Sequence, residues 1–193
     1  MKTHLSIGLR LTLVTMIFFG VIYPLVITGI AKLLPSHGEG QTIELNGKIV
    51  GFEVIGQSFS SENYFNSRPS AVNYNAASTG GSNKGPTNPE YLQQVEQRIT
   101  DFLKQNPDVK RKAIPVDLVT ASGGGLDPHI SKQAALVQIP RIAKARGVSE
   151  SELKKLVEQN TSHAFFGLAP TTVHVLKLNI ALDELISKGT KNK

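Results

Sequence analysis

Near its N-terminus the chain has a long segment in which no charge interrupts the apolar positions. Leu11–Ala31 spans 21 residues, and its polar members are three threonines and one tyrosine. As an α-helix this segment would be about 31 Å long, close to the hydrocarbon thickness of a bilayer. It is longer than the roughly 7–15 apolar residues of a signal-peptide core. We therefore expect a retained membrane-spanning helix. The alternative is a cleaved signal peptide with Gly29–Ala31 as its small-residue site.

Residues within and before this segment indicate its surroundings and its direction. Pro24 is expected to kink the helix, and Gly20 and Gly29 allow a neighbouring helix to approach closely. We therefore expect the span to pack on other membrane helices, with a simple lipid anchor as the alternative. Lys2 and Arg10 precede the segment, which favours a cytoplasmic N-terminus.

Beyond the apolar segment, the pattern first indicates a β-hairpin. Ile43 and Leu45 precede the pair Asn46–Gly47, and Ile49 follows it. Asn-Gly is the preferred pair for a type I′ turn, because both residues tolerate the positive φ that this turn requires.

A stretch of more than thirty residues, Gln57–Pro89, then shows no regular period and is rich in Ser, Asn, Gly and Pro. A loop of that length in a compact domain is either functional or disordered. Tyr64, Phe65, Arg68 and Tyr74 favour an ordered loop, because such side chains usually anchor a segment by packing and hydrogen bonding.

The remaining chain shows mainly helical periodicity. Asn88 is expected to cap a helix that starts at Pro89 and ends at Asn106–Pro107. A short strand is predicted at Pro115–Thr120, followed by a glycine-rich turn. Further helices are expected from Ser131 to Gly147 with a break at Pro140, from the capping box Ser149–Glu152 onward, and from Val175 to Ile186 before a frayed tail, Ser187–Lys193.

These elements predict an α+β fold: a single N-terminal transmembrane helix followed by one extracytoplasmic domain with a small antiparallel sheet and several helices. The expected parts are a short cytoplasmic N-terminus at residues 1–10, the transmembrane helix at residues 11–34 and the extracytoplasmic domain at residues 35–193. The chain would then cross the inner (plasma) membrane once.

Composition removes several classes of function. The chain has no cysteine, which excludes disulfides, thiolate nucleophiles and cysteine-based zinc sites. The formal net charge of +6 is modest and partly carried by the N-terminal segment, so we expect no nucleic-acid partner. Its histidines are dispersed without ligand spacing, and we expect no metal site.

The glycine-rich stretch Ser78–Pro89 superficially resembles a phosphate-binding loop. A Walker A loop needs G-x-x-x-x-G-K-[ST] between a strand and a helix, whereas Lys84 here stands before the last glycine. We expect a shaped turn, with an anion-binding nest of backbone amides at Gly80–Lys84 as the alternative. Ser122, Asp127 and His129 lie within one turn and lack a nucleophile elbow, so no catalytic residue is assigned. Asp127 is expected to be a turn or cap residue, and His129 a partly exposed turn residue.

Several motifs in order along the chain resemble the C subunit of the Kdp potassium-transporting ATPase, a bacterial P-type ATPase assembly. They are Ile22–Leu25 ("IYPL"), Ile55–Phe59 ("IGQSF"), Tyr64–Ala71 ("YFNSRPSA"), the glycine loop, Val116–Ser131, Ala134–Gly147 and Val173–Asp183. The sequence departs from the common family pattern at Lys84, Gly123 and His174, where that pattern has an apolar residue, Ser or Ala, and Asn.

The resemblance implies an accessory, non-catalytic subunit that stabilises the complex and acts as a catalytic chaperone, raising the ATP affinity of the P-type subunit. Its implied partners are that ATP-hydrolysing subunit, a potassium-selective channel-like subunit and membrane lipid. No cofactor is expected on this chain itself, and ATP is implied only at the level of the complex. Gln138 is the position to which the resemblance assigns a relation to nucleotide.

The expected topology conflicts with direct contact between this chain and ATP, because ATP is cytoplasmic while Gln138 and the glycine loop are expected outside. We therefore expect an indirect effect on ATP affinity. An ordered long loop often carries function. The predicted partner-contact residues are accordingly those of its anchored and glycine-rich parts: Tyr64, Phe65, Arg68, Gly80, Gly81, Ser82 and Asn83. The alternative is a membrane-anchored extracytoplasmic binding module that acts alone.

Overall fold

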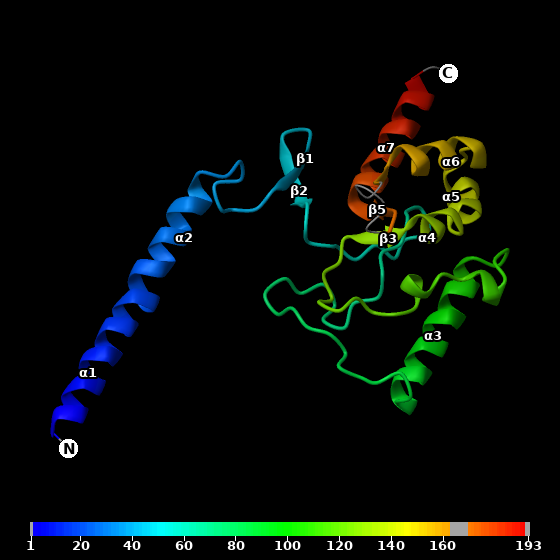
Figure 1. Cartoon of the computed structure of the whole chain (residues 1–193). Coiled ribbons are helices and arrows are strands. Elements are labelled where there is room, and N and C mark those ends of the chain that lie inside the picture. The colour runs from blue at the N-terminus through cyan, green and yellow to red at the C-terminus, as the bar shows by residue number, and fades with distance from the viewer. Residues whose placement is uncertain (1, 163–169, 192–193) are drawn as a thin grey trace. The chain divides into compact units, whose positions relative to one another are not determined.

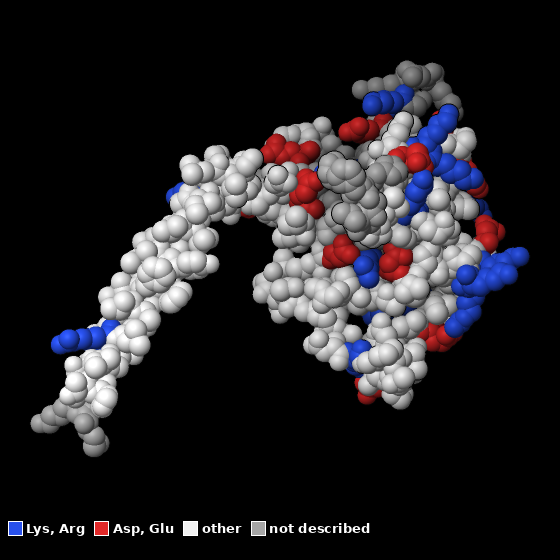
Figure 2. All heavy atoms as spheres, in the orientation of Figure 1, with Lys and Arg blue, Asp and Glu red and all other residues white. Residues whose placement is uncertain are grey.

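The computed structural model describes residues 2–162 and 170–191 and divides the chain into two compact units, Met1–Gln41 and Thr42–Lys193 (Figure 1). In the first unit, helix α1 (Lys2–Ile17) continues through a π-helical turn (Phe18–Ile22) into α2 (Tyr23–Lys32). Within the described residues, one helix, Thr3–Lys32, is long and apolar enough to cross a membrane, although a signal sequence would pass the same test. In Figure 2 its surface is almost free of charge apart from blue side chains towards its ends.

The π-helical turn lies directly before Pro24, where the sequence predicts a kink. Proline has no backbone N–H, and its ring collides with the preceding turn of a regular helix. A π-bulge relieves that collision by adding one residue to the turn, and here the N–H of Tyr23 bonds to the carbonyl of Phe18. The helix also includes residues 2–10, which the sequence assigned to a separate N-terminal part.

The second unit is α+β and contains two small antiparallel sheets among its described residues. Strands β1 (Thr42–Leu45) and β2 (Lys48–Phe52) form the predicted hairpin. Asn46 and Gly47 both have positive φ, as expected for its turn. The second sheet has the order β3-β5-β4, from His129–Ser131, Thr172–His174 and Thr161–Ser162.

The helices of this unit are α3 (Pro89–Gln105), α4 (Lys132–Leu136), α5 (Ile139–Arg146), α6 (Glu150–Gln159) and α7 (Val175–Lys191). The predicted cap at Asn88, the capping box at Ser149–Glu152 and the break near Pro140 are all confirmed. The core lies between α4–α7 and the three-stranded sheet. Among the described residues, its large fully buried apolar side chains are Phe65, Ile130, Ile139, Ile142, Leu153, Val157, Val173, Val175, Leu178 and Leu182.

Three local predictions are wrong. Pro115–Thr120 is not a strand but contains a 3₁₀ turn, Val116–Leu118, because the Asp117 carboxylate bends back to accept the Ser131 N–H at 2.7 Å. His129 lies in β3 rather than in a turn, since it pairs with His174 of β5 across the sheet. The C-terminal tail is helical as far as Lys191, because α7 continues past Ile186, and residues 192–193 lie outside the described part.

Candidate functional site

The long loop, residues 57–88, is fixed to the core by Phe65, whose side chain is fully buried. Two side-chain amides hold the backbone on either side of it. Asn179 accepts from the Phe65 N–H at 2.9 Å and donates to the Phe65 carbonyl at 3.0 Å. Gln138 accepts from the next N–H, that of Asn66, at 2.7 Å. Because these amides take the place of a neighbouring strand, the loop is ordered without belonging to a sheet.

Gln138, the residue that resemblance related to nucleotide, is fully buried at the start of α5. Its Oε1 accepts from Asn66 and from Arg141 Nη2, the latter at 2.8 Å. Its Nε2 donates to the Ala134 carbonyl at 3.0 Å. The amide thus has partners for both of its polar atoms inside the domain, and a ligand would have to displace one of them to bind it.

Arg141 is a second clamp on the loop, and sequence reasoning missed it. Its Nη1 donates to the carbonyls of Ser61 and Glu62, and its Nη2 donates to the carbonyl of Tyr64 at 3.0 Å. Its Nε donates to the Asn106 side chain at 3.0 Å. Burial lowers the pKa of Arg141 to about 10, with the Glu62 charge opposing the shift. The guanidinium therefore joins the loop, the end of α3 and the start of α5.

Tyr64 is half-buried and ties the loop to the other side of the domain. Its hydroxyl donates to Asp183 of α7 at 2.9 Å, and the same carboxylate pairs with Arg146 of α5. The Arg146 guanidinium lies 5.1 Å from the centre of the Tyr64 ring, within range of a cation–π interaction. Of the predicted contact residues, Tyr64 and Phe65 thus act first as anchors.

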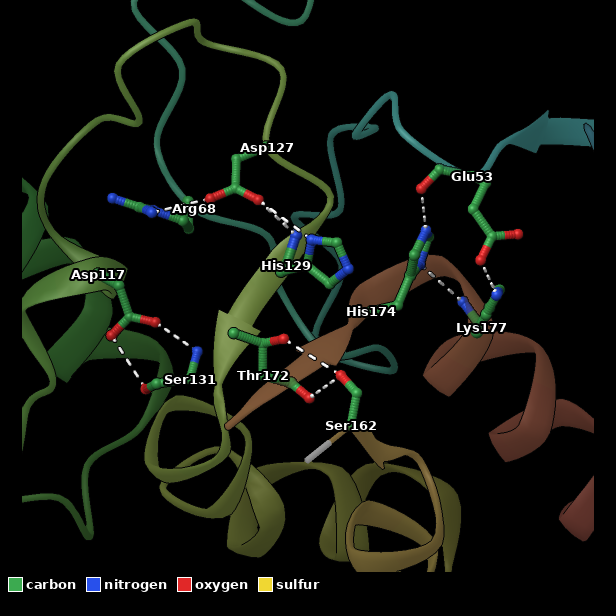
Figure 3. Close-up of polar contacts among 10 residues, drawn as sticks. All are labelled: Glu53, Arg68, Asp117, Asp127, His129, Ser131, Ser162, Thr172, His174 and Lys177. Atoms are coloured by element: carbon green, nitrogen blue, oxygen red, sulfur yellow. Dashed lines mark hydrogen bonds and ion pairs between the residues drawn. The ribbon is translucent and has the colours of Figure 1, made fainter. Parts of the chain in front are cut away.

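Arg68 lies at the outer end of the anchored part and contacts Asp127 at 2.9 Å (Figure 3). The same carboxylate accepts the backbone N–H of His129 at 3.0 Å, so Asp127 is a turn residue as predicted. Burial raises the pKa of Asp127, but hydrogen bonds from His129 and the nearby Arg68 charge outweigh it and hold the pKa below its usual value. The Arg68 carbonyl also accepts a hydrogen bond from Tyr74.

The glycines of the long loop pack against a second glycine-rich turn. The Gly80 N–H donates to the Gly124 carbonyl at 3.1 Å. A Cβ at Gly81 would lie 2.7 Å from the Gly123 oxygen, and a Cβ at Gly125, whose φ is +71°, would lie 3.0 Å from the Gly80 oxygen. The glycines therefore permit two backbones to touch, which agrees with a shaped turn, and the Gly80 N–H of the alternative anion nest is already used.

Ser82 and Asn83 complete the predicted contact residues and lie exposed beyond this glycine contact. Asn83 has a φ of +52°. The next residue, Lys84, pairs with Glu90 of α3 at 2.5 Å. The loop's two ends are therefore different: Tyr64 and Phe65 are held inside the domain, while residues 82–83 face solvent in this chain.

A cleft of about 320 Å³ separates the long loop from α3. Its polar lining residues include Ser60, Arg68 and Tyr74 of the loop and Arg98 and Asp101 of α3. The cleft therefore presents two guanidinium groups, a carboxylate and several hydroxyls beside apolar side chains such as Phe59 and Leu118.

In the described part of the chain, Ser122, Asp127 and His129 are not joined as a hydrolytic triad would be. Asp127 and His129 contact each other, but no hydrogen bond in the described part joins Ser122 to either of them. Within residues 2–162 and 170–191, no group of three or more His, Cys, Asp or Glu side chains is placed to hold a metal ion. The arrangement is that of a long loop held in place by buried side-chain hydrogen bonds.

Sequence reasoning missed Arg141, Asn179 and Asp183, which fix the long loop. The sequence offers one sign that Asn179 has a structural role: it is a polar residue between Leu178 and Leu182, which are apolar positions of a predicted helix. Such a residue, when buried, requires a hydrogen-bond partner, but the sequence does not say which segment supplies it.

The sequence matches a family model described as KdpC: K+-transporting ATPase, c chain, over residues 5–184. It is 56% identical to the potassium-transporting ATPase KdpC subunit of Flavobacterium johnsoniae, over 96% of this chain and 100% of the relative. The protein of the same name from Caldanaerobacter subterraneus is 49% identical over 95% of this chain and 96% of the relative. The protein of this name from Clostridioides difficile is 44% identical over 96% of this chain and 99% of the relative.

Proposed function

The chain belongs to the KdpC family, the C chains of the K+-transporting ATPase, and we propose that it serves this potassium-uptake complex as a non-catalytic chaperone. In that role it stabilises the assembly and raises the ATP affinity of the P-type subunit. The observation that carries the proposal is the match over residues 5–184, which takes in both the apolar helix and most of the α+β unit.

The proposed topology is a single pass through the inner membrane, with a cytoplasmic N-terminus near residues 1–10, a span at residues 11–34 and an outer domain at residues 35–193. The apolar surface of the helix supports it, since no side chain between Leu5 and Ile30 is buried within the helix's own unit. Such a surface needs lipid or other helices around it. The positive charges of Lys2 and Arg10 support a cytoplasmic position of the N-terminus.

In this proposal the effect on ATP affinity is indirect. The burial of Gln138 and the use of both its polar atoms inside the domain favour this view. A subunit that binds one conformation of its partners more tightly shifts them towards that conformation, and this changes their affinity for a distant ligand. The chain would thus act through its span and its outer surface, and its proposed partners are the P-type and channel-like subunits.

The proposed contact surface is the long loop around Tyr64 and Arg68 together with Gly80–Asn83, and the buried Phe65 anchors it instead of contacting the partner. Its support is the set of buried clamps, which hold the loop in one shape although it lacks secondary structure. A loop fixed in this way loses little conformational entropy when a partner binds.

Affinity purification of the tagged full chain in mild detergent tests the proposal. We expect the P-type and channel-like subunits to travel with the chain, together with ATPase activity that potassium stimulates. Membranes lacking this chain should require a higher ATP concentration for half-maximal activity. A chain that purifies alone as a stable, monodisperse protein would instead be the stand-alone binding module.

A further inference from the structure

Helix α3 contributes little to the core of its own domain. Of its 17 residues, only Phe102 is buried. Its apolar positions Leu92, Val95, Ile99 and Phe102 recur every three or four residues and therefore share one face. Leu92 remains 52% exposed. Figure 1 shows α3 at one edge of the unit, away from the cluster of α4–α7. Among the described residues, burial along this face decreases towards its N-terminal end, from buried Phe102 through half-buried Ile99 and Val95 to exposed Leu92.

A groove of about 630 Å³ continues this face. Ile99 forms one wall, and Ile114, Val116 and Val119 form the other. Val116 is 70% exposed although it lies in an ordered 3₁₀ turn. The groove keeps its shape because Arg98 of α3 donates to the Val119 carbonyl at 3.1 Å. An apolar hollow with a fixed backbone on both sides is suited to receive a projecting side chain.

The rim of the groove is basic, and this decides what kind of partner fits. Lys110, Arg111 and Lys112 follow one another along it. Arg111 is neutralised by a bidentate pair with Glu96. Among the described residues, neither Lys110 nor Lys112 has an ion-pair partner within 4.0 Å. Figure 2 shows blue side chains gathered along the edge where Figure 1 draws the turn after α3.

We propose that this groove is a docking site for a partner subunit of the transport complex, which inserts an apolar side chain flanked by carboxylates. The inference rests on the proposed function and adds the chemistry of one contact to it. The apolar walls would bury the inserted side chain, and Lys110 and Lys112 would pair with the flanking acids. A second copy of this chain fits less well, because it carries the same positive net charge.

Single cysteines test the burial of the groove, because the chain has no cysteine of its own. Val116→Cys reports on the groove, and Val54→Cys is a matched control, since Val54 is 71% exposed and Val116 is 70% exposed. Each full-length variant is labelled with a bulky water-soluble maleimide, once in the purified complex and once as the isolated chain in detergent. We expect the complex to slow labelling at residue 116 at least tenfold and to leave residue 54 nearly unchanged. Equal rates at residue 116 in the two states would overturn the proposal.

Zero-length carbodiimide crosslinking tests the chemistry of the partner. This reagent joins a lysine directly to a carboxylate, so the purified complex should yield a crosslink from Lys110 or Lys112 to an Asp or Glu of another subunit. Mass spectrometry would identify the acidic residue. If both lysines crosslink only within this chain or to a second copy of it, or if residue 116 is shielded equally by lipid nanodiscs without partner subunits, the proposed occupant is wrong.

Charge reversal separates this contact from the function as a whole. Lys110→Glu with Lys112→Glu should release the chain from the complex at a salt concentration that wild type withstands. Lys154→Glu with Lys155→Glu makes the same change in charge on α6 and should behave like wild type. If the chain never purifies with a potassium-stimulated ATPase, the proposed function fails. If the chain does purify with this ATPase, but the Lys110/Lys112 and Lys154/Lys155 double variants dissociate at the same salt concentration, only the proposed docking site is wrong.

Discussion

The side-chain amide of Asn179 holds both backbone groups of Phe65, with its Oδ1 2.9 Å from the Phe65 nitrogen and its Nδ2 3.0 Å from the Phe65 oxygen. One residue of α7 thus provides the hydrogen-bond partners for the backbone of a residue 114 positions earlier in the chain. This pairing lets the long loop pass through the core with its polar backbone satisfied.

Asn179→Leu should destabilise the domain strongly, because it leaves two buried backbone groups without a partner. Each such group costs about 1–3 kcal/mol. Thermal and urea unfolding of the full chain in detergent would measure the loss. Ser82→Ala, at an exposed position of the same loop, is the control and should change stability by less than about 0.5 kcal/mol. Similar stability of the two variants would contradict the anchoring role of Asn179.

Gly81→Ala should distort the contact between the two glycine-rich turns. The added Cβ would lie 2.7 Å from the Gly123 oxygen, and backbone atoms cannot move aside as a flexible side chain can. Overpacking of this kind costs about 1–3 kcal/mol. Gly85→Ala is a matched control in the same loop, since a Cβ there meets nothing within 4 Å. A melting temperature that falls for both variants, or for neither, would show that the close approach is not what Gly81 provides.

His174 should make the stability of the domain depend on pH. Its Nε2 lies 2.9 Å from the Glu53 carbonyl oxygen, and its ring meets that of His129 edge to face at 5.2 Å (Figure 3). Burial lowers the pKa of His174, and the charges of His129 and Lys177 act in the same direction, while the hydrogen bond to Glu53 opposes them.

The unfolded chain therefore binds this proton more readily than the folded chain does. The free energy of unfolding should be highest above the ordinary histidine pKa of about 6.5 and should decrease as pH falls from there through the lower folded-state pKa. Unfolding curves between about pH 5 and pH 8 would measure this slope. His174→Gln keeps a donor for the Glu53 carbonyl without a titrating group, so it should flatten the slope. An unchanged slope in that variant would assign the effect to other groups.

Gln138→Ala should act on the loop and not directly on nucleotide binding. It removes the acceptor for the Asn66 N–H and one acceptor of Arg141, so we expect a loss of about 1–3 kcal/mol in stability. Gln133→Ala, at an exposed position of α4, is the control. In the assembled complex, a photoreactive ATP analogue should label the P-type subunit and not this chain. A labelled peptide containing Gln138 would refute the indirect mechanism.

Arg68→Ala should weaken the hold of the complex on this subunit and slow growth at low potassium. The change removes the ion pair with Asp127 from the outer end of the anchored loop. Lys84→Ala removes a charge from the same loop, but its pair with exposed Glu90 is screened by solvent and contributes little to stability. That variant should assemble normally. Unchanged co-purification and growth for Arg68→Ala would remove this residue from the contact surface.

The sequence by itself determined the features that depend on neighbouring residues. The apolar helix, the Asn46–Gly47 turn, the Asn88 cap and the Ser149–Glu152 capping box all follow from interactions within a few positions of the chain. Local sterics and local hydrogen bonds decide such features, so the residue types suffice to predict them. The same holds for the α+β class and for the glycine-rich stretch as a shaped turn.

Only the tertiary structure decided which distant groups meet. Asp117 turns the predicted strand at Pro115–Thr120 into a 3₁₀ turn because it reaches Ser131. Gln138 becomes a clamp for the long loop because Asn66 lies beside it. A buried polar atom must find a partner, but packing of the whole chain selects that partner from many candidates. The sequence indicates that a buried polar group needs a hydrogen-bond partner, and the fold determines which residue is that partner.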